Sequence, residues 1–162
     1  SLFLALYPGE LYRSFDMGRN WALISADISS QVSLSDPDPD MQGPFLKALL
    51  VDPFEPNKLY AGFARGGIML SEDAGQTWRN ASFGMDPEAT VSDLVADLTR
   101  QGVIYAATLE SGVYVSTDGG TTWMSINDGL RTRAAVSLAL SADGRVLYMA
   151  STGGGVFRLG NP

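Results

Sequence analysis

The chain has 162 residues, of which 45% are hydrophobic, enough to fill the core of one ordinary domain. Its net charge of −7 argues against DNA or RNA as a partner, because binding nucleic acid requires a basic face that neutralises phosphates. The sequence contains no cysteine and no histidine, which excludes disulfides, thiol nucleophiles and the usual zinc ligands. No apolar run reaches membrane-spanning length, so we expect no membrane insertion, and nothing in the composition calls for a cofactor.

Short apolar runs separated by glycine and proline predict an all-β fold with many tight turns. A pattern of four such runs recurs along the chain, and the copies at the two ends are incomplete. In chain order, we expect an incomplete copy at 1–25, an acidic inserted loop at 26–44, complete copies at 45–85 and 89–130, and an incomplete copy at 133–160. The first copy is predicted to lack its first strand, and the last copy to lack its fourth.

The sequence Ser-x-Asp-x-Gly-x-Thr-Trp, or a close variant, closes the third run of three copies. The repeat length of about 45 residues is typical of propeller blades. The pattern and its period therefore predict a segment of a β-propeller, built from four-stranded antiparallel blades of which two are complete and two incomplete. The fixed positions are Ser14, Asp16, Gly18 and Trp21 in the first copy, Ser71, Asp73, Gly75 and Trp78 in the second, and Ser116, Asp118, Gly120 and Trp123 in the third.

Each residue type in this pattern suits a tight reversal between two strands. An aspartate can accept hydrogen bonds from backbone N–H groups across the turn, and glycine permits the positive φ that other residues resist. We expect each tryptophan to bury its ring between neighbouring sheets, with its indole N–H donating to a carbonyl. The pattern is thus predicted to be a structural staple without chemistry.

These copies resemble Asp-boxes, also called BNR repeats. They are similar to those of sialidases, xyloglucanase-type glycoside hydrolases, sortilin-type receptors and photosystem II assembly-factor-like propellers. The resemblance covers nearly the whole chain outside 26–44, although Asn20 replaces the threonine in the first copy. It implies that the boxes lie on the propeller face opposite the ligand site. The sequence leaves the location of the protein unknown, and the resemblance favours an extracellular, periplasmic or lumenal one. A shared fold does not by itself transfer a reaction.

The face opposite the boxes is expected to carry any binding site. It is built by the loops that join the second strand to the third, and the fourth strand to the first strand of the next copy. Arg65 and Glu110 occupy equivalent places in successive copies, so they could flank one groove. The candidate binding residues on this face are Tyr7, Arg65, Asp86, Glu88, Glu110 and Arg131.

The acidic inserted loop contains three aspartates that alternate with prolines, Asp36, Asp38 and Asp40. Alternating aspartates occur in calcium loops, but such loops also need a sharp glycine turn and a distal bidentate glutamate. Neither follows at a suitable spacing. We therefore expect a solvated acidic loop and no metal site.

Two functions remain open, and the sequence favours the first. One is a non-enzymatic binding or assembly module whose loops contact a protein or glycan. The other is part of a glycoside hydrolase, which needs two carboxylates about 5–10 Å apart; Asp86, Glu88, Asp93 and Glu110 could lie near the same face. No position matches the arginine triad and tyrosine nucleophile of sialidases, and we assign no catalytic residue.

The incomplete end copies should also have a partner of their own. A terminal repeat with an unpaired strand edge and an uncovered apolar face is unfavourable. We expect either further propeller blades or a self-associated second chain to cover these ends.

Overall fold

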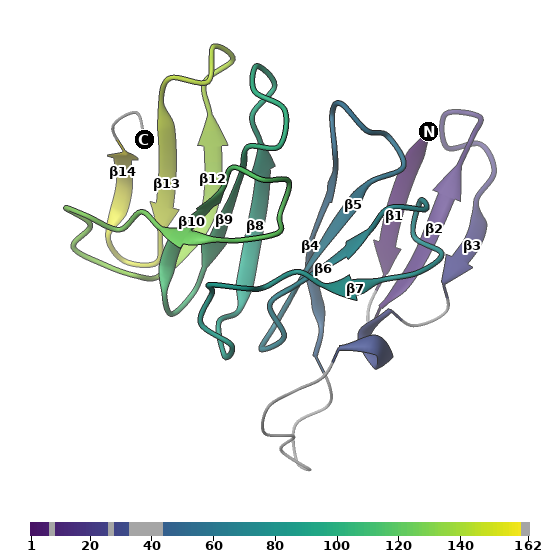
Figure 1. Ribbon diagram of the computed structural model, residues 1–162, viewed down its shortest axis with the longest axis horizontal. Helices are drawn as coiled ribbons and strands as arrows, with labels where there is room; N and C mark the ends of the chain where they lie inside the picture. Colours follow the sequence, from purple (N-terminus) through teal and green to yellow (C-terminus); the bar gives the residue numbers. More distant parts are fainter. Residues whose placement is uncertain (7–8, 26–27, 33–43, 160–162) are drawn as a thin grey trace.

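The computed structural model describes residues 1–6, 9–25, 28–32 and 44–159, which form four antiparallel sheets. Figure 1 shows the sheets side by side in chain order, like the blades of an opened fan. Blade 1 contains β1 (Leu2–Leu6), β2 (Glu10–Ser14) and β3 (Ala22–Ser25); blade 2 contains β4 (Leu46–Val51), β5 (Leu59–Phe63), β6 (Ile68–Ser71) and β7 (Arg79–Asn80); blade 3 contains β8 (Val91–Ala96), β9 (Ile104–Thr108), β10 (Gly112–Ser116) and β11 (Met124–Ser125); and blade 4 contains β12 (Ala135–Leu140), β13 (Leu147–Ser151) and β14 (Gly155–Leu159). A short 3-10 helix, η1 (Ser29–Gln31), follows blade 1.

This architecture confirms the predicted all-β propeller segment with two complete and two incomplete blades. Blades 2 and 3 have strand orders β4-β5-β6-β7 and β8-β9-β10-β11, with every neighbouring pair antiparallel. Within the described residues, blade 1 has no strand equivalent to β4, and blade 4 has none equivalent to β7. In the same part of the chain, no helix has the length and apolar character required to cross a bilayer.

The Asp-boxes share one face of the molecule with the loops that follow the inner strands β4 and β8. The amide of Ala74 in the second box donates to the Asn57 carbonyl at 2.8 Å, and the amide of Gly119 in the third box donates to the Gly102 carbonyl at 2.9 Å. We call this side the box face and the opposite side the loop face. In an antiparallel four-stranded blade, the remaining connections must lie on the loop face.

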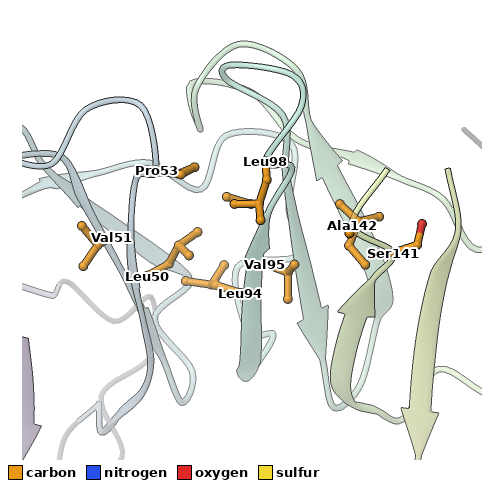
Figure 2. A pocket seen from close by; sticks show the side chains of 10 residues that line it. Leu50, Val51, Pro53, Leu94, Val95, Leu98, Ser141 and Ala142 are labelled. Carbon is orange, nitrogen blue, oxygen red and sulfur yellow. The ribbon is translucent and has the colours of Figure 1, made fainter. Parts of the chain in front are cut away.

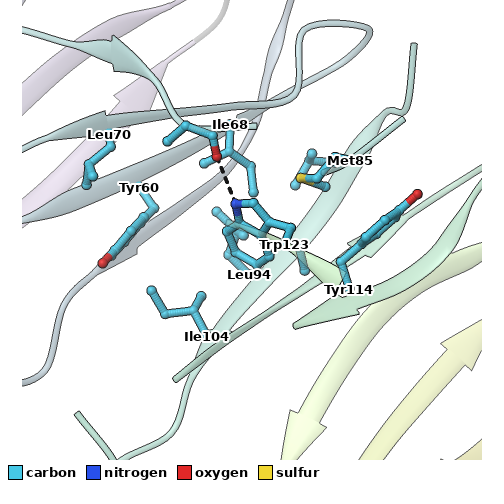
Figure 3. Packing of buried hydrophobic residues seen from close by; sticks show 11 residues of the cluster. Tyr60, Ile68, Leu70, Met85, Leu94, Ile104, Tyr114 and Trp123 are labelled. Atoms are coloured by element: carbon cyan, nitrogen blue, oxygen red, sulfur yellow. Dashed lines mark hydrogen bonds between the residues drawn. The ribbon is translucent and has the colours of Figure 1, made fainter. Parts of the chain in front are cut away.

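The core lies between the blades. Strands β5, β9 and β10 are buried along their whole length, because a neighbouring sheet covers each of their two faces. Figure 3 shows the cluster between blades 2 and 3, in which Tyr60 and Ile68 of blade 2 meet Leu94 and Trp123 of blade 3. A second cluster joins blades 3 and 4, and a smaller one packs Ile28 and Val32, which flank η1, against blade 2. Burial of this apolar surface is the main term that stabilises the stack.

Each box forms the same set of hydrogen bonds. In the second box, the amide of Gly75 donates to Ser71 Oγ at 2.8 Å. The amide and hydroxyl of Thr77 donate to the two oxygens of the Asp73 carboxylate at 2.8 and 2.6 Å. These bonds from Thr77 lower the pKa of Asp73 to about 2. In the first box, Asn20 replaces the threonine, and its side-chain amide donates to Asp16 at 2.6 Å.

The turn of each box uses two residues with positive φ, where the sequence pattern predicted one. The expected glycines have φ values of 88° at Gly18, 93° at Gly75 and 83° at Gly120. The residue before each glycine also has positive φ, and in two boxes it is a non-glycine residue, Met17 at 64° and Ala74 at 61°. The local bonds to serine and aspartate hold these residues in the left-handed region.

The three box tryptophans differ in burial. Trp123 is 3% exposed, and its indole N–H donates to the Ala81 carbonyl of blade 2 at 2.8 Å. Trp78 is half-buried against the small cluster that contains Ile28 and Phe63. The prediction that every ring is buried is wrong for Trp21, which is 39% exposed. No sheet of the described residues covers that side of blade 1, so the Trp21 indole packs only on its own blade.

Candidate functional site

On the loop face, the connection 85–90 between blades 2 and 3 is fixed at both ends by residues that the sequence identified. Arg65 Nη2 and Glu88 Oε2 form an ion pair at 3.3 Å, with the two side chains 31% and 46% exposed. At the other end, Glu110 Oε2 accepts a hydrogen bond from the Thr90 amide at 2.8 Å. Arg65 and Glu110 therefore flank this connection.

Asp86 lies within the same connection and holds it to blade 3. Its Oδ2 accepts from the Ser111 hydroxyl at 2.6 Å, and its Oδ1 accepts from the Glu88 amide at 3.1 Å. The bond from Ser111, supported by that from Glu88, lowers the pKa of Asp86. Asp86 is thus an ionised hydrogen-bond acceptor at neutral pH.

The structure places the six candidate binding residues as follows. Arg65, Asp86, Glu88 and Glu110 gather around one connection. Arg131, which follows blade 3, is exposed and takes part in none of the ion pairs formed by the described residues. Tyr7 lies outside the described residues, as do the aspartates at 36, 38 and 40. Among the residues that are described, no group of three or more acidic side chains could hold a metal ion.

Asp93, a further carboxylate considered for hydrolysis, lies at the junction of two inner strands. Its Oδ2 accepts from the Ser137 hydroxyl and from the Leu138 amide, both at 2.8 Å, and so joins β8 to β12. Its Oδ1 accepts from the Leu94 amide at 2.9 Å. Because Oδ2 connects two strands and Oδ1 binds the backbone of its own strand, Asp93 is a structural residue in this arrangement.

An apolar pocket opens at the ends of the inner strands, where they approach the propeller axis. It has a volume of about 300 Å³ and is lined mainly by Leu50, Val51, Pro53, Leu94, Leu98 and Ala142. Figure 2 shows that these residues come from three blades. The polar lining side chain, Ser141, already accepts hydrogen bonds from the amides of Arg145 and Val146. The pocket can therefore accommodate an apolar group but offers little to orient a polar one.

Sequence reasoning missed this pocket because it considered only the loop face. It also missed two aspartates that close the turns after β4 and β8. Asp52 is 3% exposed and accepts from the Phe54 amide at 2.8 Å, while Asp97 is fully buried and pairs with Arg100 at 2.7 Å. Burial would raise the pKa of Asp97, but hydrogen bonds from Thr99 and Arg100 outweigh it and lower that pKa. The sequence signal that could have identified Asp52 and Asp97 is the recurrence of aspartate at the same position of the repeat.

Comparison with known proteins agrees with this architecture. A family profile described as "Sortilin, neurotensin receptor 3" matches residues 9–152. The chain belongs to the Sortilin-Vps10 family. No curated protein matches the chain.

Solved structures with a similar fold include two enzymes and YCF48. The GH74 enzyme of Niastella koreensis has a TM-score of 0.69 and 23% identity over 93% of this Sortilin-Vps10 chain and 24% of the enzyme. YCF48 from Cyanidioschyzon merolae has a TM-score of 0.54 and 19% identity over 76% of this chain and 35% of YCF48. The NanB sialidase of Streptococcus pneumoniae has a TM-score of 0.52 and 21% identity over 88% of this chain and 24% of the sialidase. The chain thus spans about a quarter to a third of the length of these propellers.

Proposed function

We propose that this chain is part of a non-enzymatic binding or assembly module, and that its loop face contacts a protein or glycan ligand. The observation that carries the proposal is the network around the connection 85–90. Arg65, Asp86 and Glu110 fix a polar loop between two rigid blades. A fixed loop on a rigid scaffold suits recognition, because little conformational entropy is lost when a ligand binds.

The relatives support a peptide or protein as the ligand. The family description names a neurotensin receptor. A structure of YCF48 with a bound D1 peptide has a TM-score of 0.50 to this chain at 14% identity. In the present chain, the ion pair of Arg65 and Glu88 remains partly exposed, so a charged group of a ligand could reach it.

A glycoside hydrolase is the second candidate, and the likeness to the GH74 enzyme and to NanB favours it. Within this chain, the carboxylates considered for that chemistry are engaged in structural hydrogen bonds. A general acid needs a raised pKa, and the pKa of Asp86 is lowered. A hydrolase would therefore need catalytic carboxylates from other parts of the complete protein.

Two assays on the complete protein test the proposal. The first selects ligands from a random peptide library and from a panel of xyloglucan oligosaccharides and sialosides, and then measures the affinity of the selected ligand for Arg65→Ala. We expect a loss of at least about tenfold, because an ion pair to the ligand would be removed. Arg79→Ala is the matched control, since Arg79 pairs with Glu72 beside the second box at 3.8 Å.

The second assay measures turnover of the same saccharides. We expect none. Turnover of any of these saccharides would reject the non-enzymatic proposal, and its loss in Asp86→Asn or Glu110→Gln would place the catalytic carboxylates in this chain. A ligand whose affinity responds equally to Arg65→Ala and Arg79→Ala would remove the loop face from consideration.

A further inference from the structure

Aspartate is followed by glycine at three places in the chain, Asp118-Gly119, Asp128-Gly129 and Asp143-Gly144. This dipeptide is prone to a spontaneous rearrangement, because glycine places no side chain beside its own amide nitrogen. The nitrogen can attack the preceding aspartate side chain when the carboxyl group and the amide are both free and the backbone has room to turn. Since the three pairs share one sequence, their surroundings decide which of them reacts.

In the pair Asp128-Gly129, neither the carboxylate nor the glycine amide takes part in a hydrogen bond formed by the described residues. Both residues are exposed at the tip of a turn. The turn is closed by a bond from the Leu130 amide to the Asn127 carbonyl at 3.1 Å, which makes no use of the Gly129 amide. A Cβ added at Gly129 would meet nothing within 4 Å. The two groups that must meet are therefore both available, with space around them.

In the pair Asp118-Gly119, both groups are held by the third Asp-box. The Asp118 carboxylate accepts from the amide and the hydroxyl of Thr122 at 2.9 and 2.6 Å. The Gly119 amide nitrogen, which would be the nucleophile, donates to the Gly102 carbonyl at 2.9 Å, and Gly119 is buried. Rearrangement at this pair must first break these bonds.

The pair Asp143-Gly144 is held in a similar way. Asp143 Oδ1 accepts from the Ser141 hydroxyl at 2.7 Å and from the Arg145 amide at 3.1 Å. The Gly144 amide donates to the Ser141 carbonyl at 2.8 Å. Gly144 is also buried, and a Cβ added there would meet Asp97 Oδ2 of blade 3 at 2.8 Å. The backbone at this pair therefore has no room to turn toward the carboxyl group.

We propose that Asp128 is a site of spontaneous isoaspartate formation in the folded protein. The Gly129 nitrogen forms a bond to Asp128 Cγ, and its proton leaves with the carboxyl hydroxyl as one molecule of water, which gives a cyclic succinimide. Water then opens the ring at either carbonyl carbon. One opening restores aspartate, and the other yields isoaspartate, in which the main chain runs through the side-chain carbon. No atom is oxidised or reduced, so the reaction needs only water.

The product alters the loop face, because the connection 127–134 between blades 3 and 4 lies there. Isoaspartate adds one carbon to the main chain directly after Asn127. The Asn127 side chain is buried, accepts from the Val113 amide at 2.8 Å and donates to the Ser111 carbonyl at 2.9 Å. We therefore expect the modification to shift the loop 109–111 as well as the turn. The site and its chemistry do not depend on the proposed function.

Ageing of the complete protein at neutral pH and physiological temperature tests the assignment. Isoaspartate is quantified by methyl transfer from S-adenosylmethionine with an isoaspartyl methyltransferase. Digestion with an endoproteinase that cleaves before aspartate but not before isoaspartate then locates it. We expect Asp128 to convert at least about tenfold faster than Asp118 or Asp143, because the hydrogen bonds of those two pairs must open first. In urea, where these bonds are lost, the three rates should agree within about threefold.

Variants of the turn identify the reacting groups. Asp128→Glu should abolish the signal at this position, because the longer side chain must close a larger and less favourable ring. Gly129→Ala should slow conversion by at least about fivefold, because a Cβ beside the nitrogen hinders the attack and alanine resists the φ of 79°. Gly153→Ala is the matched control, since Gly153 is also exposed, has a φ of 75° and has open space around it. It should leave the rate at Asp128 unchanged.

The inference is overturned if the three pairs convert at equal rates in the folded protein, or if Asp128 converts only after unfolding. It is also overturned if Gly129→Ala and Gly153→Ala convert equally fast. If Gly129→Ala does not fold, the comparison of the three pairs in the unchanged protein decides the matter. Unchanged amide signals of Ser111 and Val113 in the converted protein would refute the expected shift of the loop 109–111.

Discussion

The first and third Asp-boxes have the same local geometry but different surroundings. Trp21 is 39% exposed, whereas Trp123 is 3% exposed and donates to a carbonyl of the preceding blade. In both boxes, the aspartate still accepts from the amide and side chain four residues later, with distances between 2.6 and 2.9 Å. The turn therefore forms without a sheet on the tryptophan side, and only the burial of the tryptophan depends on one.

The glycines of the two boxes differ in the same way. A Cβ added at Gly18 would meet Trp21 Cζ2 at 3.6 Å, an ordinary contact. A Cβ added at Gly120 would meet Tyr60 Cε1 of blade 2 at 2.7 Å, which is too close. In the third box, the glycine serves the turn and also the close approach of two blades.

The largest expected difference in stability is between the alanine variants of Trp123 and Trp21. Trp123→Ala should lower the free energy of unfolding by about 3–5 kcal/mol, because it leaves a cavity in the core and an unpaired Ala81 carbonyl. Trp21→Ala should lower it by about 1 kcal/mol, since much of that ring is already in water. Urea unfolding followed by circular dichroism measures both. Equal losses would show that the indole acts within its own turn.

The alanine variants of Gly18 and Gly120 should show a smaller difference in stability. Gly18→Ala should cost about 1 kcal/mol, because alanine resists the positive φ of 88°. Gly120→Ala should cost about 2–3 kcal/mol, because it meets the same restriction and also displaces Tyr60. Thermal unfolding of the two variants compares them directly. A larger loss of stability in Gly18→Ala than in Gly120→Ala would contradict the close approach of Gly120 to Tyr60.

The smallest expected effect is a decrease in stability at acidic pH, to which the first and the second box both contribute. The pKa values of Asp16 and Asp73 are lowered from 3.8 to about 2 by hydrogen bonds from the residue four positions later. An aspartate whose pKa is lower in the folded than in the unfolded protein stabilises the fold above pH 4. This stabilisation is lost as the pH falls from about 4 to 2. The urea concentration at the unfolding midpoint, measured between pH 6 and 2, should decrease as the pH falls from about 4 to 2.

Asp73→Asn provides the control for this dependence, because it removes one of the titrating carboxylates. Its midpoint should be lower at pH 6 and should change less between pH 4 and 2. An unchanged slope would assign the acid sensitivity to other carboxylates.

The fold was predictable from the sequence because the box is a local device. The bonds of Asp73 and Ser71 all lie within eight consecutive residues, so the motif alone specifies them. Bonds between blades were not predictable in this way. Tyr60 donates to the Gly119 carbonyl 59 residues away, and Trp123 to the Ala81 carbonyl 42 residues away. These pairs depend on which sheets become neighbours, and no short pattern records that.

The candidate site was predictable only in part for the same reason. Repeat spacing placed Arg65 and Glu110 on equivalent loops and so on one face. It could not reveal that the connection 85–90 lies between them, with Glu88 paired to Arg65 and Thr90 held by Glu110. The bond between Asp86 and Ser111 likewise depends on the path of that connection.

The carboxylate of Asp93 has a geometric consequence for the complete ring. It joins the inner strands β8 and β12 of blades 3 and 4, while larger rings, such as Tyr105 and Phe157, fill the space between the same two blades nearer the rim. The difference in side-chain bulk between axis and rim sets the angle between successive blades. That angle determines how many blades are needed to complete a full circle, so a few side chains at the inner strands help to set the diameter of the whole assembly.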